Sequence, residues 1–141
     1  MTSISQPERA TQNRVARLFR DELGYRHLGD WSGRAGNSCI EESLLAPFMA
    51  ASGCSPAQIS RALHALRTEA HHPGRSLYAS NQAVYSLLRY GVQVKLEAGA
   101  LTETVHLIDW SRLEKNDFAM AEEVTLKGGL ARRPQSRVLR W

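Results

Sequence analysis

The hydrophobic period of this chain changes once, near Gly91, and this change limits the folds that the chain can adopt. Before Gly91, apolar residues recur every three or four positions, which is the period of an amphipathic helix. After Gly91, apolar and polar residues alternate, which is the period of a half-buried strand. Helices followed by strands indicate an α+β fold. With 141 residues, the chain is long enough to bury a core and to form one domain.

Three of the helical segments open with the sequence signature of a capping box, a serine followed three residues later by Glu or Gln. The pairs are Ser5 with Glu8, Ser38 with Glu41, and Ser55 with Gln58. Pro47 lies inside the second segment, where it is expected to end or kink the helix near Ala46 because it has no N–H group. A fourth helix is expected to end at Gly91.

The alternating part of the chain predicts three strands. Residues 92–96, 105–110 and 118–126 contain the alternating apolar side chains. The loops between these segments are short, so neighbouring strands are expected to pair antiparallel. The predicted fold is therefore α+β, with N-terminal helices followed by about three antiparallel strands.

The formal net charge is +4, but its distribution does not indicate a broad basic surface. Five of the 18 Lys and Arg residues lie in residues 127–141, which contain none of the 14 acidic residues. A short basic segment can attract phosphate. A nucleic-acid-binding domain, however, usually spreads its basic residues over one face of the fold.

Cys39 and Cys54 are the only cysteines, and their spacing fits neither a disulfide framework nor a zinc site. The chain has no apolar leader and no run of about 18 apolar residues. We therefore expect a cytoplasmic protein with free thiols, no bound metal of its own and no membrane role.

Seven short motifs follow one another along the chain in a characteristic order. They are Glu8 with Thr11-Gln12, Asp21-Glu22-Leu23-Gly24-Tyr25, Asn81 to Tyr85, Leu87 to Val92, Ile108-Asp109-Trp110, Asn116-Asp117-Phe118 and Arg132-Arg133-Pro134. In order and spacing, over residues 7–134, they resemble the N-terminus of the restriction (R) subunit of type I restriction endonucleases. The resemblance implies that residues 1–134 correspond to the start of the nuclease domain of that subunit, and that residues 135–141 form a divergent tail.

The resemblance also implies a PD-(D/E)xK-type nuclease fold, in which an Asp and a Glu hold Mg²⁺ and a Lys lies two residues after the Glu. Where the family places its catalytic Asp, this chain has Gln135, and no Glu-x-Lys follows. An amide replaces a carboxylate poorly because it brings no charge to a hard cation. We therefore expect a truncated fragment that stops before the catalytic motif and has no cleavage activity of its own.

By the same resemblance, Mg²⁺ and ATP are implied for the full-length family protein and neither is implied for this fragment. Gly128-Gly129 is not followed by Lys-Ser or Lys-Thr, so it does not match an ATPase phosphate-binding loop. The implied partners are DNA and the modification and specificity subunits of a type I restriction complex. A non-catalytic module that binds DNA or these subunits is the alternative function.

Glu8 is the candidate catalytic acid, because the resemblance implies an acid on the first helix that reaches toward the metal. Its other possible role is to close the capping box with Ser5. Thr11-Gln12 would lie either beside a scissile phosphate or on a polar helix face. In a stand-alone cleaving enzyme, Glu8, Asp109 and Asp117 would form a carboxylate cluster. The two aspartates also suit turns, where they would accept hydrogen bonds from loop amides.

Arg132 and Arg133 are the candidate DNA-binding residues, because forked guanidinium groups match phosphate oxygens. Trp110 and Phe118 are expected to pack on the sheet rather than to stack on bases. His106 is expected to lie on the surface, since it alternates with apolar neighbours.

Overall fold

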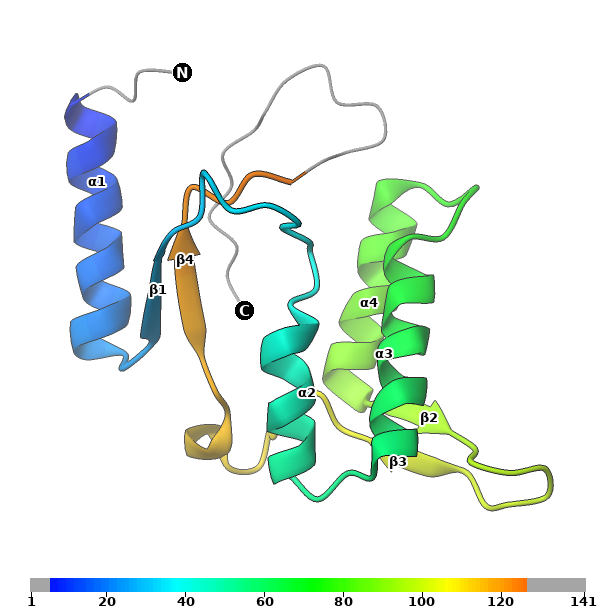
Figure 1. Ribbon diagram of the computed structural model, residues 1–141. Coiled ribbons are helices and arrows are strands. Elements are labelled where there is room, and N and C mark those ends of the chain that lie inside the picture. Colours follow the sequence, from blue (N-terminus) through cyan, green and yellow to red (C-terminus); the bar gives the residue numbers. More distant parts are fainter. Residues whose placement is uncertain (1–5, 127–141) are drawn as a thin grey trace. The chain divides into compact units, whose positions relative to one another are not determined.

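The computed structural model describes residues 6–126, which form two compact units (Figure 1). The first unit contains the described residues up to Cys39 and those from Asp117 onward, and the second contains Ile40 to Asn116. The second unit is therefore inserted into the sequence of the first.

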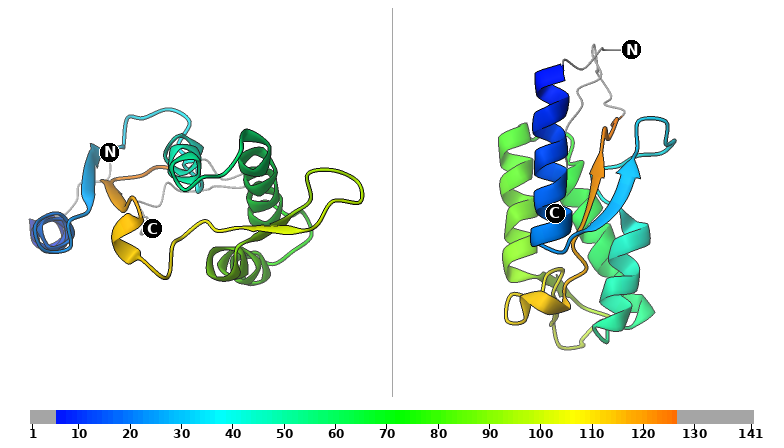
Figure 2. Two further views of the ribbon diagram at one scale, coloured as in Figure 1. Left: turned by 90° about the horizontal axis from the view of Figure 1, so that it is seen from below. Right: turned by 90° about the vertical axis from the view of Figure 1, so that its left-hand side faces the viewer.

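The first unit begins with helix α1 (Gln6–Arg17), which continues into a π-helical turn at Leu18–Glu22. Strand β1 (Arg26–Asp30) follows and pairs in parallel with strand β4 (Ala119–Glu122). Figures 1 and 2 show α1 beside this two-stranded ribbon. The buried apolar residues of the unit come from β4 and the segment after it: Ala119, Met120, Ala121 and Val124.

The parallel ribbon corrects the predicted sheet. The strand predicted at residues 118–126 is β4, and it pairs with β1 rather than antiparallel with its predicted neighbour. The sequence did not indicate β1, because Arg26–Asp30 contains a single large apolar residue, Leu28, and shows no alternation. Backbone pairing makes this segment a strand, beginning with the hydrogen bond from Arg26 N to Phe118 O at 3.0 Å.

The second unit, described throughout, contains three α-helices and an antiparallel hairpin. Its elements are α2 (Glu42–Ala51), α3 (Pro56–Ala70), α4 (Leu77–Tyr90), β2 (Val92–Val94), β3 (Glu103–Val105) and a 3₁₀ turn at Leu113–Lys115. Val92 lies opposite Val105 in the hairpin, so the antiparallel pairing predicted for the first two strands is confirmed. Strand β2 is shorter than the predicted 92–96, and β3 shares only Val105 with the predicted 105–110.

The helix starts agree with the sequence at α3 and differ from it at α2. Ser55 Oγ accepts a hydrogen bond from Gln58 N at 3.2 Å, and Gln58 Oε1 accepts one from Ser55 N at 2.8 Å. The capping box predicted there is confirmed. The box predicted at Ser38 and Glu41 is wrong, because α2 starts at Glu42 and its N-cap residue, Glu41, makes no side-chain cap.

The sequence predicts that Pro47 ends or kinks the second helix near Ala46. The predicted end is wrong, because α2 continues to Ala51, and the kink stays a prediction. A proline in a helix interior removes one hydrogen bond and costs about 3 kcal/mol. The residues after Pro47 offset this cost by burial. Met49 is completely inaccessible to solvent, and Phe48 packs against the core. Burying a side chain of this size stabilises by about 1.5–3 kcal/mol, so tertiary packing overrides the local preference.

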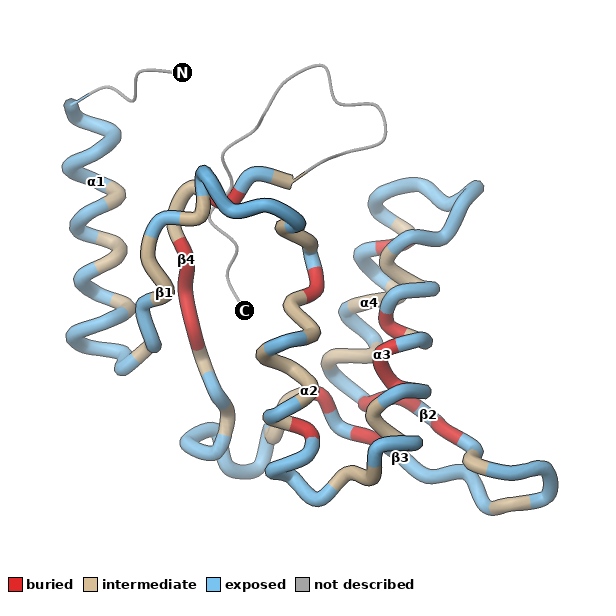
Figure 3. Tube along the Cα trace, in the orientation of Figure 1, coloured by how far each residue is buried: buried red, intermediate tan, exposed pale blue. Residues whose placement is uncertain are grey.

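A single hydrophobic core holds the second unit together. The buried positions of α3 are Ala62, Leu63 and Leu66, which repeat at helical spacing and form one stripe. Figure 3 shows these positions together with the buried parts of β2 and β3. Because this stripe faces the core, the polar residues of α3 lie on its other faces.

Gly91 connects α4 to β2 in a backbone conformation that favours glycine, with φ of +84°. A Cβ atom at this position would lie 2.7 Å from Thr104 Cγ2 and 3.0 Å from Val105 O. Both neighbours belong to β3. The missing side chain therefore permits the end of α4 to approach β3 closely.

Gly91→Ala is expected to destabilise the protein by about 2–4 kcal/mol, since strain from positive φ adds to overpacking against β3. Gly99→Ala is the matched control, because Gly99 has φ of +83° but no atom within 4 Å of an added Cβ. The control is expected to cost only about 1–2 kcal/mol. Urea denaturation followed by circular dichroism measures both, and equal losses would show that the close approach contributes nothing.

Candidate functional site

Glu8 lies in the first turn of α1 and is exposed to solvent. An acid at this position interacts favourably with the positive end of the helix dipole. Ser5, the other member of its predicted capping box, lies outside the described residues, so that box stays a prediction. The assignment of Glu8 as a catalytic acid also stays a prediction.

Asp109 organises the turn that follows β3. Its Oδ1 accepts hydrogen bonds from Ser111 N at 3.1 Å and from Arg112 N at 2.9 Å. The amide of Asp109 itself donates to Asn116 Oδ1 at 2.8 Å. The backbone hydrogen bond from Arg112 is the main cause that holds the pKa of Asp109 below its ordinary value. The prediction that Asp109 caps a turn is confirmed.

Asp117 forms an ion pair with Arg26, with 2.6 Å between Oδ2 and Nη2. Among residues 6–126, no group of three or more His, Cys, Asp and Glu side chains is placed to hold a metal ion. Asp117 therefore has an arginine partner in the structure rather than a place in a group of three or more such ligands. The cluster of Glu8, Asp109 and Asp117 imagined for a stand-alone enzyme therefore gains no support.

A polar contact that the sequence did not indicate joins α1 to the end of β4. Gln12 Nε2 donates to Glu123 Oε1 at 3.0 Å, and the contact is partly buried. Glu123 has φ of +53°, the only positive value at a non-glycine residue among the described residues. Such a conformation costs about 1–2 kcal/mol. The neighbouring Glu122 Oε2 lies 2.9 Å from His27 Nε2 of β1. Two consecutive glutamates therefore contact two different elements, Glu123 contacting α1 and Glu122 contacting β1.

The two predicted packing aromatics have different surroundings. Phe118 stacks on Tyr25 with 5.2 Å between ring centroids, so its packing role is confirmed. Trp110 donates from Nε1 to Leu88 O at 3.0 Å, and the guanidinium of Arg89 lies 5.1 Å from its ring centroid. Trp110 remains 45% exposed, so it anchors to the end of α4 rather than packing on a sheet.

His106 is exposed, as predicted. Arg132, Arg133 and Gln135 lie outside residues 6–126, which are the residues that the structure describes. The phosphate-binding role of the two arginines, the missing catalytic Asp and the boundary between residues 134 and 135 therefore stay predictions.

The contact between Gln12 and Glu123 is expected to couple α1 to the ribbon by about 1 kcal/mol, the usual net worth of a hydrogen bond. A double-mutant cycle with Gln12→Ala and Glu123→Ala, measured by urea denaturation, gives this coupling energy. Thr11→Ala is the matched control, because the Thr11 hydroxyl donates to Pro7 O within α1. Coupling of the same size between Thr11 and Glu123 would contradict the assignment.

The lowered pKa of Asp109 predicts a pH dependence of stability. The folded pKa lies below the unfolded value, so the ionised carboxylate stabilises the fold above about pH 4, where the unfolded group is ionised. This contribution is lost as pH falls through the folded pKa. Asp109→Asn is therefore expected to lower the unfolding temperature at pH 7, and by less at pH 3, where the stabilising contribution has begun to fall. A difference that is the same at both pH values would contradict this assignment.

Comparison with known proteins identifies the family of the chain. The sequence model described as "Type I restriction enzyme R protein N terminus" matches residues 5–135, which is most of the chain. No curated protein and no solved structure gives a significant match. No helix in the described part is long and apolar enough to cross a membrane. The chain belongs to the family of type I restriction enzyme R protein N-terminal domains.

Proposed function

We propose that this chain serves DNA restriction as the start of the DNA-cleaving domain of a type I R subunit, with a PD-(D/E)xK-type fold. The family match over residues 5–135 is the observation that carries the proposal. The mixture of four α-helices and small sheets in the described residues is compatible with an α+β nuclease domain. The proposed partners are DNA and the modification and specificity subunits, and the proposed location is the cytoplasm.

We further propose that the residues of this chain do not cleave DNA by themselves. Gln135 stands where the family resemblance places the catalytic Asp. The two aspartates that could replace it are committed elsewhere, Asp109 to backbone amides and Asp117 to Arg26. A carboxylate that already accepts hydrogen bonds or forms an ion pair would have to lose these contacts to bind a metal ion, and the loss would destabilise the fold. These observations support a role in positioning or binding rather than in hydrolysis.

A non-catalytic module that binds DNA or a partner subunit is the second candidate, and the surface of α4 favours it. Four large apolar or aromatic side chains of this helix are more than 60% exposed: Leu77, Tyr78, Tyr85 and Tyr90. Exposed tyrosines are enriched at protein interfaces because they combine a large apolar area with a hydrogen-bonding group. The family assignment is the same for both candidate functions, and they differ only in the role of the chain within the restriction complex.

The purified chain is expected to leave supercoiled plasmid intact in the presence of Mg²⁺ while it binds duplex DNA in a salt-dependent manner. Agarose gel electrophoresis measures nicking, and fluorescence anisotropy of a labelled duplex measures binding. Glu8→Gln tests the remaining candidate acid, and Glu114→Gln, an exposed carboxylate on the 3₁₀ turn, is the matched control.

Nicking that is lost in Glu8→Gln and kept in Glu114→Gln would overturn the proposal that the chain is inactive alone. Absence of duplex binding at low salt would count against any direct DNA contact by these residues. Binding without nicking would support the role proposed here.

A further inference from the structure

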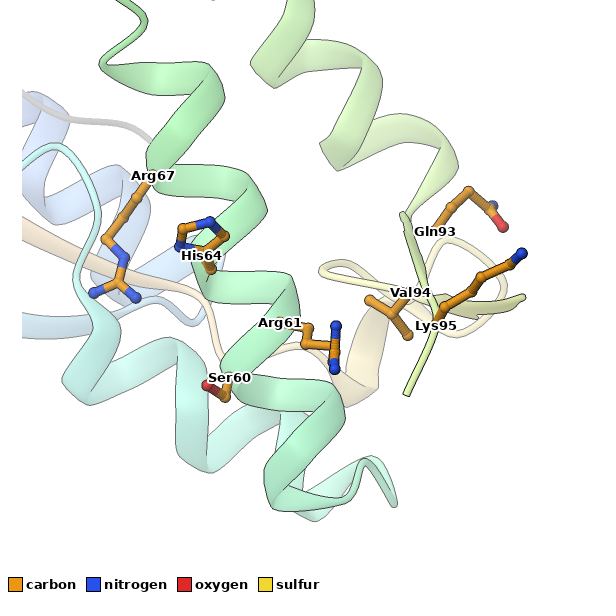
Figure 4. A pocket seen from close by; sticks show the side chains of 7 residues that line it. All are labelled: Ser60, Arg61, His64, Arg67, Gln93, Val94 and Lys95. Carbon is orange, nitrogen blue, oxygen red and sulfur yellow. The ribbon is translucent and has the colours of Figure 1, made fainter. Parts of the chain in front are cut away.

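A groove on the second unit gathers basic side chains from α3 and from Lys95, the residue after β2 (Figure 4). Its volume is about 390 Å³, and it is open to solvent. The lining residues are Ser60, Arg61, His64, Arg67, Gln93, Val94 and Lys95. None of them is acidic, and three carry a permanent positive charge.

The local sequence explains why these side chains share one surface. Arg61, His64 and Arg67 are spaced by three residues on α3, so they follow one side of the helix. The apolar stripe of α3 occupies its core-facing side. In β2 and the residue after it, buried and exposed residues alternate, which leaves Gln93 and Lys95 exposed beside α3.

The hydrogen bonds of the groove orient its arginines without neutralising all of them. Arg61 Nη2 donates to Leu96 O at 3.0 Å, which ties the guanidinium to the hairpin and leaves other N–H donors available. Arg67 Nη1 lies 3.2 Å from Glu42 Oε1, so this arginine is partly compensated.

Arg61 and Lys95 are groove residues that the described ion pairs of the unit leave without a carboxylate partner. Within residues 40–116, Arg75 pairs with Glu69 and Arg112 pairs with Asp109. Neither Arg61 nor Lys95 takes part in an ion pair of the described residues. Two uncompensated cations beside polar Ser, Gln and His side chains make an anion-binding surface.

We propose that this groove binds successive backbone phosphates of duplex DNA. The inference rests on the proposed function and adds where on the chain the DNA lies. Arg61 and Arg67 are six residues apart, which is about 9 Å along a helix axis. One DNA strand advances about 3.4 Å along the duplex axis per phosphate, and the phosphates lie farther apart than this along the strand itself, so the groove is long enough for about two of them. Contacts of this kind are independent of base sequence and fix the register of the duplex.

An extended phosphate backbone fits the groove better than a single phosphate ion does. The side chains of Arg67, Arg61 and Lys95 are spread along the groove rather than directed at one point (Figure 4). A compact anion would need donors that converge on it, as they do in helix N-terminal or nest-type sites.

The test measures the fluorescence anisotropy of a labelled duplex of about 25 base pairs, between about 50 and 200 mM salt, for the full chain and two double variants. The groove variant carries Arg61→Gln and Lys95→Gln. The control variant carries Arg75→Gln and Lys115→Gln, which removes the same charge from outside the groove. The groove variant is expected to bind at least tenfold more weakly at low salt, and the slope of log affinity against log salt should fall by about 2, one for each lost phosphate contact. The control should stay within about twofold of the wild type, since it keeps both contacts.

Each other outcome overturns a defined part of the inference. Equal weakening in both variants would mean that net charge alone matters, and unchanged binding in the groove variant would place the DNA elsewhere; both leave the proposed function standing. Absence of binding by the wild type would overturn the proposed DNA contact as well. Titration with inorganic phosphate, followed by NMR of the Arg61 side chain, identifies a single-ion site if it saturates while the duplex does not bind. Thermal unfolding of all variants must match the wild type.

Discussion

The parallel pairing of β1 with β4 is the constraint on which the first unit depends. Parallel strands cannot be joined by a tight turn and need a long crossover. Here the connection between the strands contains the whole second unit, Ile40 to Asn116. Residues from opposite ends of the described chain therefore have to meet before the ribbon exists, and they are held by Arg26 with Asp117 and by His27 with Glu122. Because α1 has no buried residue of its own, its place beside the ribbon depends on contacts such as that of Gln12 with the end of β4.

The second unit could be predicted from sequence to a large extent, and the first could not. In the second unit the decisive interactions are local: Ser55 with Gln58 at the start of α3, the period of α3 and α4, and the tight approach at Gly91. In the first unit the decisive interaction joins segments about ninety positions apart in sequence, and Arg26–Asp30 has no pattern that marks it as a strand. Pro47 is a case in which the sequence does carry a local signal and tertiary packing overrides it. The burial of Met49 outweighs the preference for a helix end at the proline.

The candidate site was predictable in its residue types and not in their use. A carboxylate suits both roles considered for Asp109 and Asp117, in a catalytic cluster or in a turn, so only the contacts distinguish the two roles. The contacts are to backbone amides at Asp109 and to Arg26 at Asp117, and they stabilise the fold. The sequence does not indicate the basic groove, and the reason is different. Arg61, His64 and Arg67 form an ordinary polar helix face in the sequence, and only the fold brings Lys95, about thirty positions later, to the same groove.

The groove also changes how the charge of the chain relates to DNA. Residues 40–116 contain seven basic and seven acidic residues, so the second unit is neutral overall, and the net charge of +4 depends on the five basic residues after 126. A phosphate responds to local potential rather than to this sum, because charges separated by more than about 10 Å are largely screened at 0.1 M salt. Ion pairs remove several of the seven basic residues from this local balance, and Arg61 and Lys95 are left on the same surface. A unit that is neutral overall can therefore have a basic groove. The positions of its carboxylates determine which basic side chains are left without an ion pair on that surface.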